Sequence, residues 1–221
     1  MDANATTENG QPIILSYTSS DGEVTVSASA TWQMWWPTEP GYPEPDFWFG
    51  SMTRDDDPDN GSLETIGFVD PVAYDAWCAA NGGSPLLSAP ADAAAIAQQL
   101  IADPNFETTA PVAVRIGGLE AISMDVALAL GGRACGVGRI ADISRWIHTL
   151  DPRELRDSLE PGLRLRLYLI DLPQGMSVQT LAITVVAPAD SFEEFIAETA
   201  PIIESIVFHP RVGITSPSEV P

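Results

Sequence analysis

Three side chains that can bind an anion alternate along one stretch of this sequence. Arg164, Arg166 and Tyr168 alternate with leucines in the segment LRLRLYLID, so in a strand they share one face while the leucines face the core. Two guanidinium groups side by side can hold a carboxylate or a phosphate through forked hydrogen bonds. We expect a neighbouring strand to bring Trp146 and His148 beside them. The alternative is that both arginines pair with the chain's abundant acids on an exposed sheet face.

A second candidate lies in the acidic segment RDDDPDNGSLE, where Asp55, Asp57 and Asp59 occupy every second position. This spacing can turn three carboxylates toward one hard cation, and Gly61 permits the sharp bend of a calcium loop. The segment departs from the helix-loop-helix pattern, because Ile66 stands where a bidentate glutamate is needed. Two interpretations remain, a non-helical calcium loop or a solvated hairpin tip with an Asn-Gly turn. Apart from calcium, we expect no cofactor.

Aromatic residues and prolines are concentrated in the segment 32–49, WQMWWPTEPGYPEPDFWF. Exposed tryptophan and tyrosine rings stack on sugars and on prolines, so this aromatic-proline segment suits a platform for a carbohydrate or a peptide. The alternative is that the same rings cap an open end of the sheet. The residues assigned to the platform are Trp35, Trp36, Tyr42 and Trp48.

Motifs for catalysis are scarce in this sequence. There is no G-x-S-x-G elbow, no phosphate-binding G-x-x-x-x-G-K-[ST] loop and no H-E-x-x-H. His148 and His209 are the only histidines, and neither has a local partner for a catalytic triad. The glycine-rich segment 131–138 precedes an expected strand, whereas a phosphate-binding loop precedes a helix. The sequence therefore favours a non-catalytic protein over an enzyme.

Hydrophobic periodicity predicts the elements that must position these residues. Apolar residues at helical spacing predict two helices, at about 90–102 with Ser88 as its cap and at 191–206 with a capping box from Ser191 to Glu194. A two-residue Gly117-Gly118 turn predicts a β-hairpin, and so does the alternation around Pro173-Gln174-Gly175. Strands are expected within the ranges 13–18, 24–32, 47–52, 65–69, 111–116, 119–126, 137–150, 163–170 and 181–185.

These elements predict an α+β fold in one domain, with two main helices packed on an antiparallel sheet. The chain has 221 residues and 45% hydrophobic content, which suffices for a full core. We expect a polar N-terminal spacer at 1–12, the domain at 13–209 and a mobile tail at 210–221. The spacer is not a signal peptide, since it lacks a basic and an apolar region.

The charge of the chain is strongly negative. The formal net charge is -21, and all ten basic residues are arginine. Residues 1–114 hold only Arg54 among them, so the negative field is concentrated in the first half. Such a surface repels nucleic-acid phosphates and anionic lipid headgroups, and we expect neither as a partner. No run of 18 apolar residues exists, so we also expect no membrane insertion by this segment.

The two cysteines, Cys78 and Cys135, are too few for a zinc site and have no C-x-x-C spacing. A single disulfide bond is the economical interpretation, and it implies an oxidising compartment. Two buried free thiols are the alternative, because cysteine is also a common core residue in cytosolic proteins. Two titratable thiols in the unreduced native protein would exclude the disulfide.

One known group of proteins has a similar order of features. The helix at 90–102, TTAPVAVRIGGLEA, a lone cysteine, LYLIDLP with its partner strand and the closing IIESIVF resemble bacterial extracytoplasmic domains of unknown function. Members of that group are lipoproteins or lie outside a membrane anchor, and their fold is similar to the PsbP-like α/β/α sandwich. The resemblance covers about 64–208. It implies a curved antiparallel sheet between helices and a location outside the cytoplasm, and no catalytic residue comes with it.

The expected function is therefore that of a non-catalytic extracytoplasmic domain that binds a protein or a small ligand. On this view, the signal or anchor that export requires is not within the sequence. The alternative is a carbohydrate-binding or hydrolytic module that uses the aromatic-proline segment. Neither the specificity nor the partner follows from the sequence.

Overall fold

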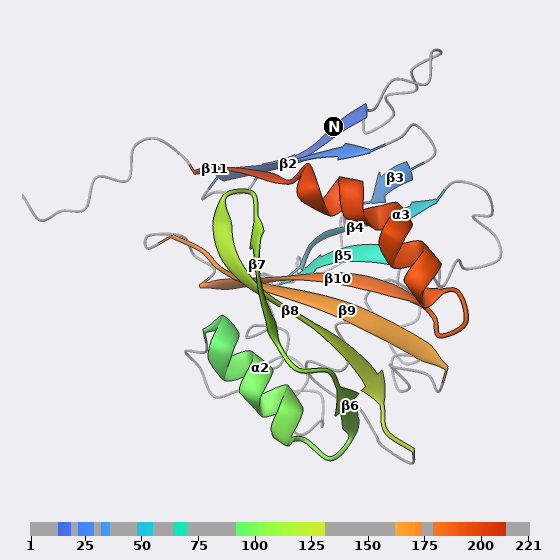
Figure 1. Ribbon diagram of the computed structural model, residues 1–221. Helices are drawn as coiled ribbons and strands as arrows, with labels where there is room; N and C mark the ends of the chain where they lie inside the picture. Colours follow the sequence, from blue (N-terminus) through green and yellow to red (C-terminus); the bar gives the residue numbers. More distant parts are fainter. Residues whose placement is uncertain are drawn as a thin grey trace, which may run out of the picture.

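The computed structural model describes residues 13–18, 22–28, 32–35, 48–54, 64–69, 92–130, 162–173 and 179–210. For residues 13–18, 22–28, 32–35, 48–54, 65, 67–69 and 210, the backbone alone is described. Within these ranges, antiparallel strands and two helices form the predicted α+β fold (Figure 1). None of the described helices is long and apolar enough to cross a bilayer.

The strands of the described ranges form two sheets. The larger sheet has eight strands in the order β3-β4-β5-β10-β9-β8-β6, and β7 also pairs with β8. The smaller sheet has three strands in the order β1-β2-β11 and was not predicted. The bounds are β1 (Ile13–Thr18), β2 (Gly22–Ala28), β3 (Trp32–Trp35), β4 (Trp48–Arg54), β5 (Thr65–Val69), β6 (Phe106–Thr108), β7 (Val112–Ile116), β8 (Leu119–Leu128), β9 (Leu163–Asp171), β10 (Thr180–Pro188) and β11 (Val207–Pro210).

The hairpin of β9 and β10 lies in the middle of the larger sheet, and its prediction is confirmed. The two strands are antiparallel along their whole length, with Tyr168 of β9 opposite Ile183 of β10. The leucines of β9 are at most 8% exposed, whereas Arg164, Arg166 and Tyr168 between them are partly exposed. Alternation along a strand thus places the polar row on one face of the sheet and the leucine row on the other.

The two helices cover opposite faces of these central strands (Figure 1). α3 (Phe192–Glu204) packs on the face that carries Ile183 and Val185 of β10 and forms a buried core with it. α2 (Ala93–Ala102) lies beside β6, β8 and β9. The leucine row faces the α2 side, because it alternates with the residues under α3. With both faces covered, residues 180–187 of β10 are all buried.

The start of α2 differs from the prediction. Asp92, and not Ser88, is the N-cap, and its Oδ1 accepts a hydrogen bond of 2.7 Å from the Ala95 N–H. Asp171, at the end of β9, accepts a second one of 2.8 Å from the Ala93 N–H. Two carboxylates therefore accept hydrogen bonds from free N–H groups in the first turn. Their negative charges also interact favourably with the positive end of the helix dipole.

The start of α3 also differs. Ser191 makes no side-chain hydrogen bond to the helix backbone, so the capping box predicted with Glu194 does not form. The Ser191 hydroxyl instead donates to Oε1 of Glu64, just before β5, at 3.0 Å. The first turn still contains two acids, Glu193 and Glu194, whose negative charges interact favourably with the positive end of the helix dipole.

The β7–β8 hairpin has the predicted two-residue turn. Gly117 and Gly118 have φ values of 57° and 82°, and positive φ at both positions is characteristic of a type I′ turn. The turn lies against β11, because a Cβ built on Gly117 would be 2.5 Å from the Phe208 ring. No atom lies within 4 Å of a Cβ built on Gly118.

Candidate anion-binding site

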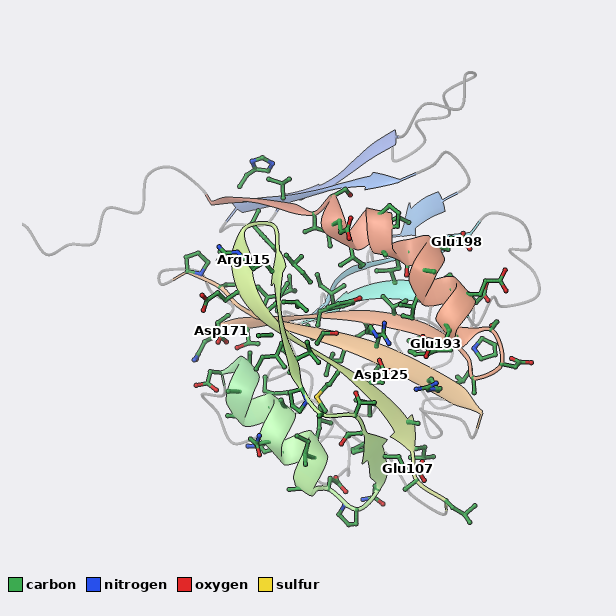
Figure 2. The ribbon with its side chains drawn as sticks, viewed as in Figure 1. Glu107, Arg115, Asp125, Asp171, Glu193 and Glu198 are labelled. Carbon is green, nitrogen blue, oxygen red and sulfur yellow. The ribbon has the colours of Figure 1, made fainter. Side chains whose placement is uncertain are left out.

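The face of the sheet beside the start of α3 carries a cluster of charged side chains. Arg164 and Arg166 project from β9 on this face, and the register places Asp125 of β8 directly beside Arg166. Glu193 comes from the first turn of α3. Figure 2 shows Asp125 and Glu193 at the same end of the central strands. We refer to Arg164, Arg166, Asp125, Phe192 and Glu193 as the arginine site.

Arg166 is fully engaged inside the site. Its Nε donates to Oδ1 of Asp125 at 2.7 Å, and its Nη2 donates to Oδ2 at 3.0 Å. The Asp125 side chain is 10% exposed and that of Arg166 is 23% exposed, so this forked pair is largely shielded from water. The hydrogen bond to Asp125 raises the pKa of Arg166 above its ordinary value, which keeps the guanidinium charged. Both Nε and Nη2 of Arg166 are therefore occupied by hydrogen bonds to Asp125.

The backbone of Asp125 is also fixed. Its N–H donates to Oγ1 of Thr109 at 2.8 Å, and its carbonyl accepts from the Thr109 N–H at 3.0 Å. Thr109 lies between β6 and β7, where the pairing with β8 changes register by one residue. A carboxylate held in this way presents its two oxygens to the arginines in a defined orientation.

Arg164 is held more loosely than Arg166. Its Nη2 is 3.5 Å from Oδ2 of Asp125, and its Nη1 is 3.5 Å from Oε1 of Glu193. Both contacts are long for charged hydrogen bonds, and the Glu193 side chain is 71% exposed. The Arg164 side chain itself is 33% exposed. Its guanidinium can therefore bind a further oxyanion without losing a short ion pair to the described residues.

The ring of Phe192 supports both guanidinium groups. The Cζ atom of Arg164 lies 4.6 Å from the ring centroid, and that of Arg166 lies 5.5 Å from it. These distances are within the range of cation–π attraction. Phe192 is itself 0% exposed and belongs to the core under α3. The core thus fixes the surface that orients the two cations.

Tyr168 continues the row but faces a different environment. It is partly buried against the core under α3. Burial raises the pKa of its hydroxyl above 10.0, and the positive charge of Arg166 opposes this effect. Tyr168 therefore remains a neutral hydroxyl at physiological pH beside the arginines.

The raised pKa of Tyr168 gives an expected pH dependence of stability. The unfolded chain loses this proton near pH 10.0, whereas the folded chain retains it to higher pH. The free energy of unfolding should therefore decrease as the pH rises above 10, and the decrease should be smaller in Tyr168→Phe. Chemical denaturation between pH 8 and 11 measures it. Identical profiles for the two proteins would contradict the prediction.

Most of the other predicted site residues lie outside the described residues. For Trp35 and Trp48 the backbone alone is described, at the end of β3 and the start of β4, and these two strands pair with each other. The aromatic platform and the disulfide therefore stay predictions. The predicted residues outside the described ranges are Trp36, Tyr42, Cys78, Cys135, Trp146 and His148.

The calcium loop is likewise untested. Asp55, Asp57 and Asp59 follow β4 but lie outside the described ranges. Within those ranges, no three side chains of the types that bind metals are grouped as a metal site requires. Calcium binding at the acidic segment therefore stays a prediction.

Sequence reasoning missed the acids and the ring of the arginine site. Asp125 lies in the segment ISMDVAL, where it alternates with the buried residues Met124 and Val126. A single carboxylate on one face of an apolar strand was a usable signal for a charged partner across the sheet. Phe192 gave no such signal, because its periodicity is that of an ordinary core residue.

Comparison with solved structures gives a weak likeness of fold. No family model and no curated protein matches the sequence. Among solved structures, the fold is similar to a crystal structure of LpqN, a protein involved in cell envelope biogenesis of Mycobacterium tuberculosis, with a TM-score of 0.45 and 14% identity. The match covers 92% of this chain and 87% of that chain. It establishes no shared family, so the resemblance to PsbP-like domains stays a prediction.

Proposed function

We propose that this chain is a non-catalytic binding domain that holds an oxyanion of its ligand or protein partner at Arg164. The observation that carries the proposal is the state of this guanidinium, which lies over Phe192 with two contacts of 3.5 Å and a third of its side chain exposed. Arg166 and Asp125 next to it form a closed ion pair, and the buried Phe192 ring orients the Arg164 guanidinium. A preoriented, partly free guanidinium is suited to forked recognition of a carboxylate or a phosphate group.

The net charge limits the kind of ligand. A chain with a formal net charge of -21 repels molecules that carry many negative charges. Short-range contact with one guanidinium can overcome this repulsion only for a ligand with few other negative charges. We therefore expect a single oxyanion on an otherwise neutral or basic ligand.

The compartment is part of the same proposal. The order of elements and motifs over about 64–208 resembles extracytoplasmic bacterial domains, and the two cysteines suit an oxidising environment. A disulfide between Cys78 and Cys135 in protein isolated under non-reducing conditions would support this location. Free thiols at both positions in protein from its native host would argue against it.

Titration of arginine side-chain signals by NMR tests the site. Acetate and inorganic phosphate serve as probes in separate series, with sodium chloride varied to keep the ionic strength constant. We expect the Arg164 Nε–Hε signal to shift in a saturable way in at least one series. The Arg115 signal in the same spectra is the internal reference, because this exposed arginine lies outside the arginine site.

Two variants separate the fork from the charge. Arg164→Gln removes both and should weaken anion binding at least tenfold. Arg164→Lys keeps the charge without the planar fork and should bind with intermediate affinity. Melting temperatures verify that both variants fold. Equal affinity of wild type and Arg164→Gln, or an unsaturable shift of the same size at Arg115, would contradict the proposed site.

A further inference from the structure

Strand β7 lies at an edge of the larger sheet. β8 pairs with β9 on one side, while β6 and β7 pair with successive parts of its other side. No described strand pairs with the outer side of β7. Residues 109–113 are all exposed, and Val112 is 57% exposed. The described chain therefore leaves one side of β7 open to solvent.

The register of the hairpin shows which backbone groups point outward. Ile116 and Leu119 flank a two-residue turn, so they form a hydrogen-bonded pair. Because such pairs alternate along an antiparallel ladder, Val114 and Val112 also direct their backbone groups toward β8. The N–H and C=O groups of the alternate residues, Ala113 and Arg115, point away from the sheet. They form an unpaired hydrogen-bonding edge.

This edge has little protection against pairing. Proteins commonly place charged side chains or prolines along free edge strands to prevent association. Residues 108–114, TTAPVAV, carry no charge, and Arg115 is the one charged residue of β7. Four outward groups, the N–H and C=O of Ala113 and of Arg115, are available within β7, and Pro111 just before it has no N–H. The exposed Val112 adds an apolar contact for a side chain of an added strand.

We propose that β7 binds an extended, basic segment of a partner protein as an additional antiparallel strand. The exposed side chains beside this edge include Glu107 of β6, whereas the exposed Glu120 of β8 lies opposite Arg115 in the register. Figure 2 shows Glu107 and Arg115 toward opposite ends of the β6–β7 edge. A partner with lysine or arginine side chains complements Glu107 and the formal net charge of -21. A second copy of the chain carries the same negative charge and is repelled.

Hydrogen exchange measured by NMR tests the added strand. The probe is an end-capped peptide, Lys-Val-Thr-Val-Thr-Val-Lys, whose alternating residues favour an extended strand. In the free protein, the amides of Ala113 and Arg115 should exchange quickly, and those of Val112 and Val114 slowly. Saturating peptide should slow exchange at Ala113 and Arg115 at least tenfold. The same peptide with glutamate in place of lysine should produce less than a twofold change.

A matched pair of variants isolates the backbone donor. Ala113→Pro removes the outward N–H, and proline is tolerated where an edge N–H faces solvent. Ala113→Val retains the N–H and has a higher β-propensity. The peptide should bind Ala113→Pro at least tenfold more weakly than wild type, and Ala113→Val within twofold. Melting temperatures confirm that both variants are folded.

Four outcomes would overturn this proposal. They are the absence of protection at Ala113 and Arg115 with 1 mM peptide, unchanged affinity in Ala113→Pro, equal affinity for the glutamate peptide, and a wild-type dimer in solution that Ala113→Pro dissociates. None of them bears on anion binding at Arg164, because the probes and the variants are different.

Discussion

Replacement of Asp125 by alanine is expected to lower the free energy of unfolding by about 3 kcal/mol. Loss of one partner of a buried ion pair costs about 3 to 5 kcal/mol, because the other charge remains buried without a counterion. The lower end applies here, since the side chain of Arg166 keeps 23% of its surface in water. Asp125 also contacts Arg164, so one substitution affects both guanidinium groups. Chemical denaturation measures the change.

Two further variants identify the cause of this loss. Glu193→Gln removes an acid that is 71% exposed and 3.5 Å from Arg164, and it should change stability by less than about 0.5 kcal/mol. The double variant Asp125→Ala, Arg166→Met removes both charges and should be more stable than Asp125→Ala alone. If the double variant is the less stable of the two, an unpaired buried charge is not the cause.

Gly117→Ala is expected to cost about 2 to 5 kcal/mol, and Gly118→Ala about 1 to 2 kcal/mol. Both glycines have positive φ, which costs alanine roughly 1 to 2 kcal/mol at each position. A Cβ on Gly117 also overlaps the Phe208 ring, and overpacking adds about 1 to 3 kcal/mol. A Cβ on Gly118 meets no atom within 4 Å. The difference between the two variants therefore measures the contact between the hairpin and β11.

A double variant tests this explanation. Phe208→Ala removes the ring that the new methyl group would meet. In this background, Gly117→Ala should cost clearly less than it does with Phe208 present, because the ring overlap is gone and only the positive φ and the Ile206 carbonyl oxygen, 3.0 Å from the new Cβ, remain. Equal costs of the two glycine substitutions in the wild-type background would show that the turn does not pack on Phe208.

Local patterns in the sequence predicted the elements that form the site. The alternation of leucine with Arg164, Arg166 and Tyr168 specified a strand with two distinct faces, and apolar residues at helical spacing specified α2 and α3. The glycine pair specified the β7–β8 turn, since few other residues adopt positive φ at two successive positions. These signals depend on neighbours within a few residues along the chain.

The remaining features depend on register between distant segments. Asp125 faces Arg166 because β8 and β9 pair in one particular alignment, and a shift of one residue would place the acid on the α2 face. The secondary-structure propensity of each segment does not determine this alignment, because the alignment depends on residues far apart in the sequence. The same holds for Ser191, whose hydroxyl donates to Glu64, just before β5, in preference to the adjacent helix backbone. The arginine face was therefore predictable, whereas the register that places Asp125 opposite Arg166 was not.

The smaller sheet has a consequence for the order of folding. β11 pairs with β2, so Val207 meets Thr25 across almost the whole sequence. Contacts of such large sequence separation form slowly, because the intervening chain must first be ordered. During synthesis, β1 and β2 leave the ribosome long before β11 exists, and a chain that ends before Val207 lacks this strand. The three-stranded sheet is therefore completed only after β11 has been made.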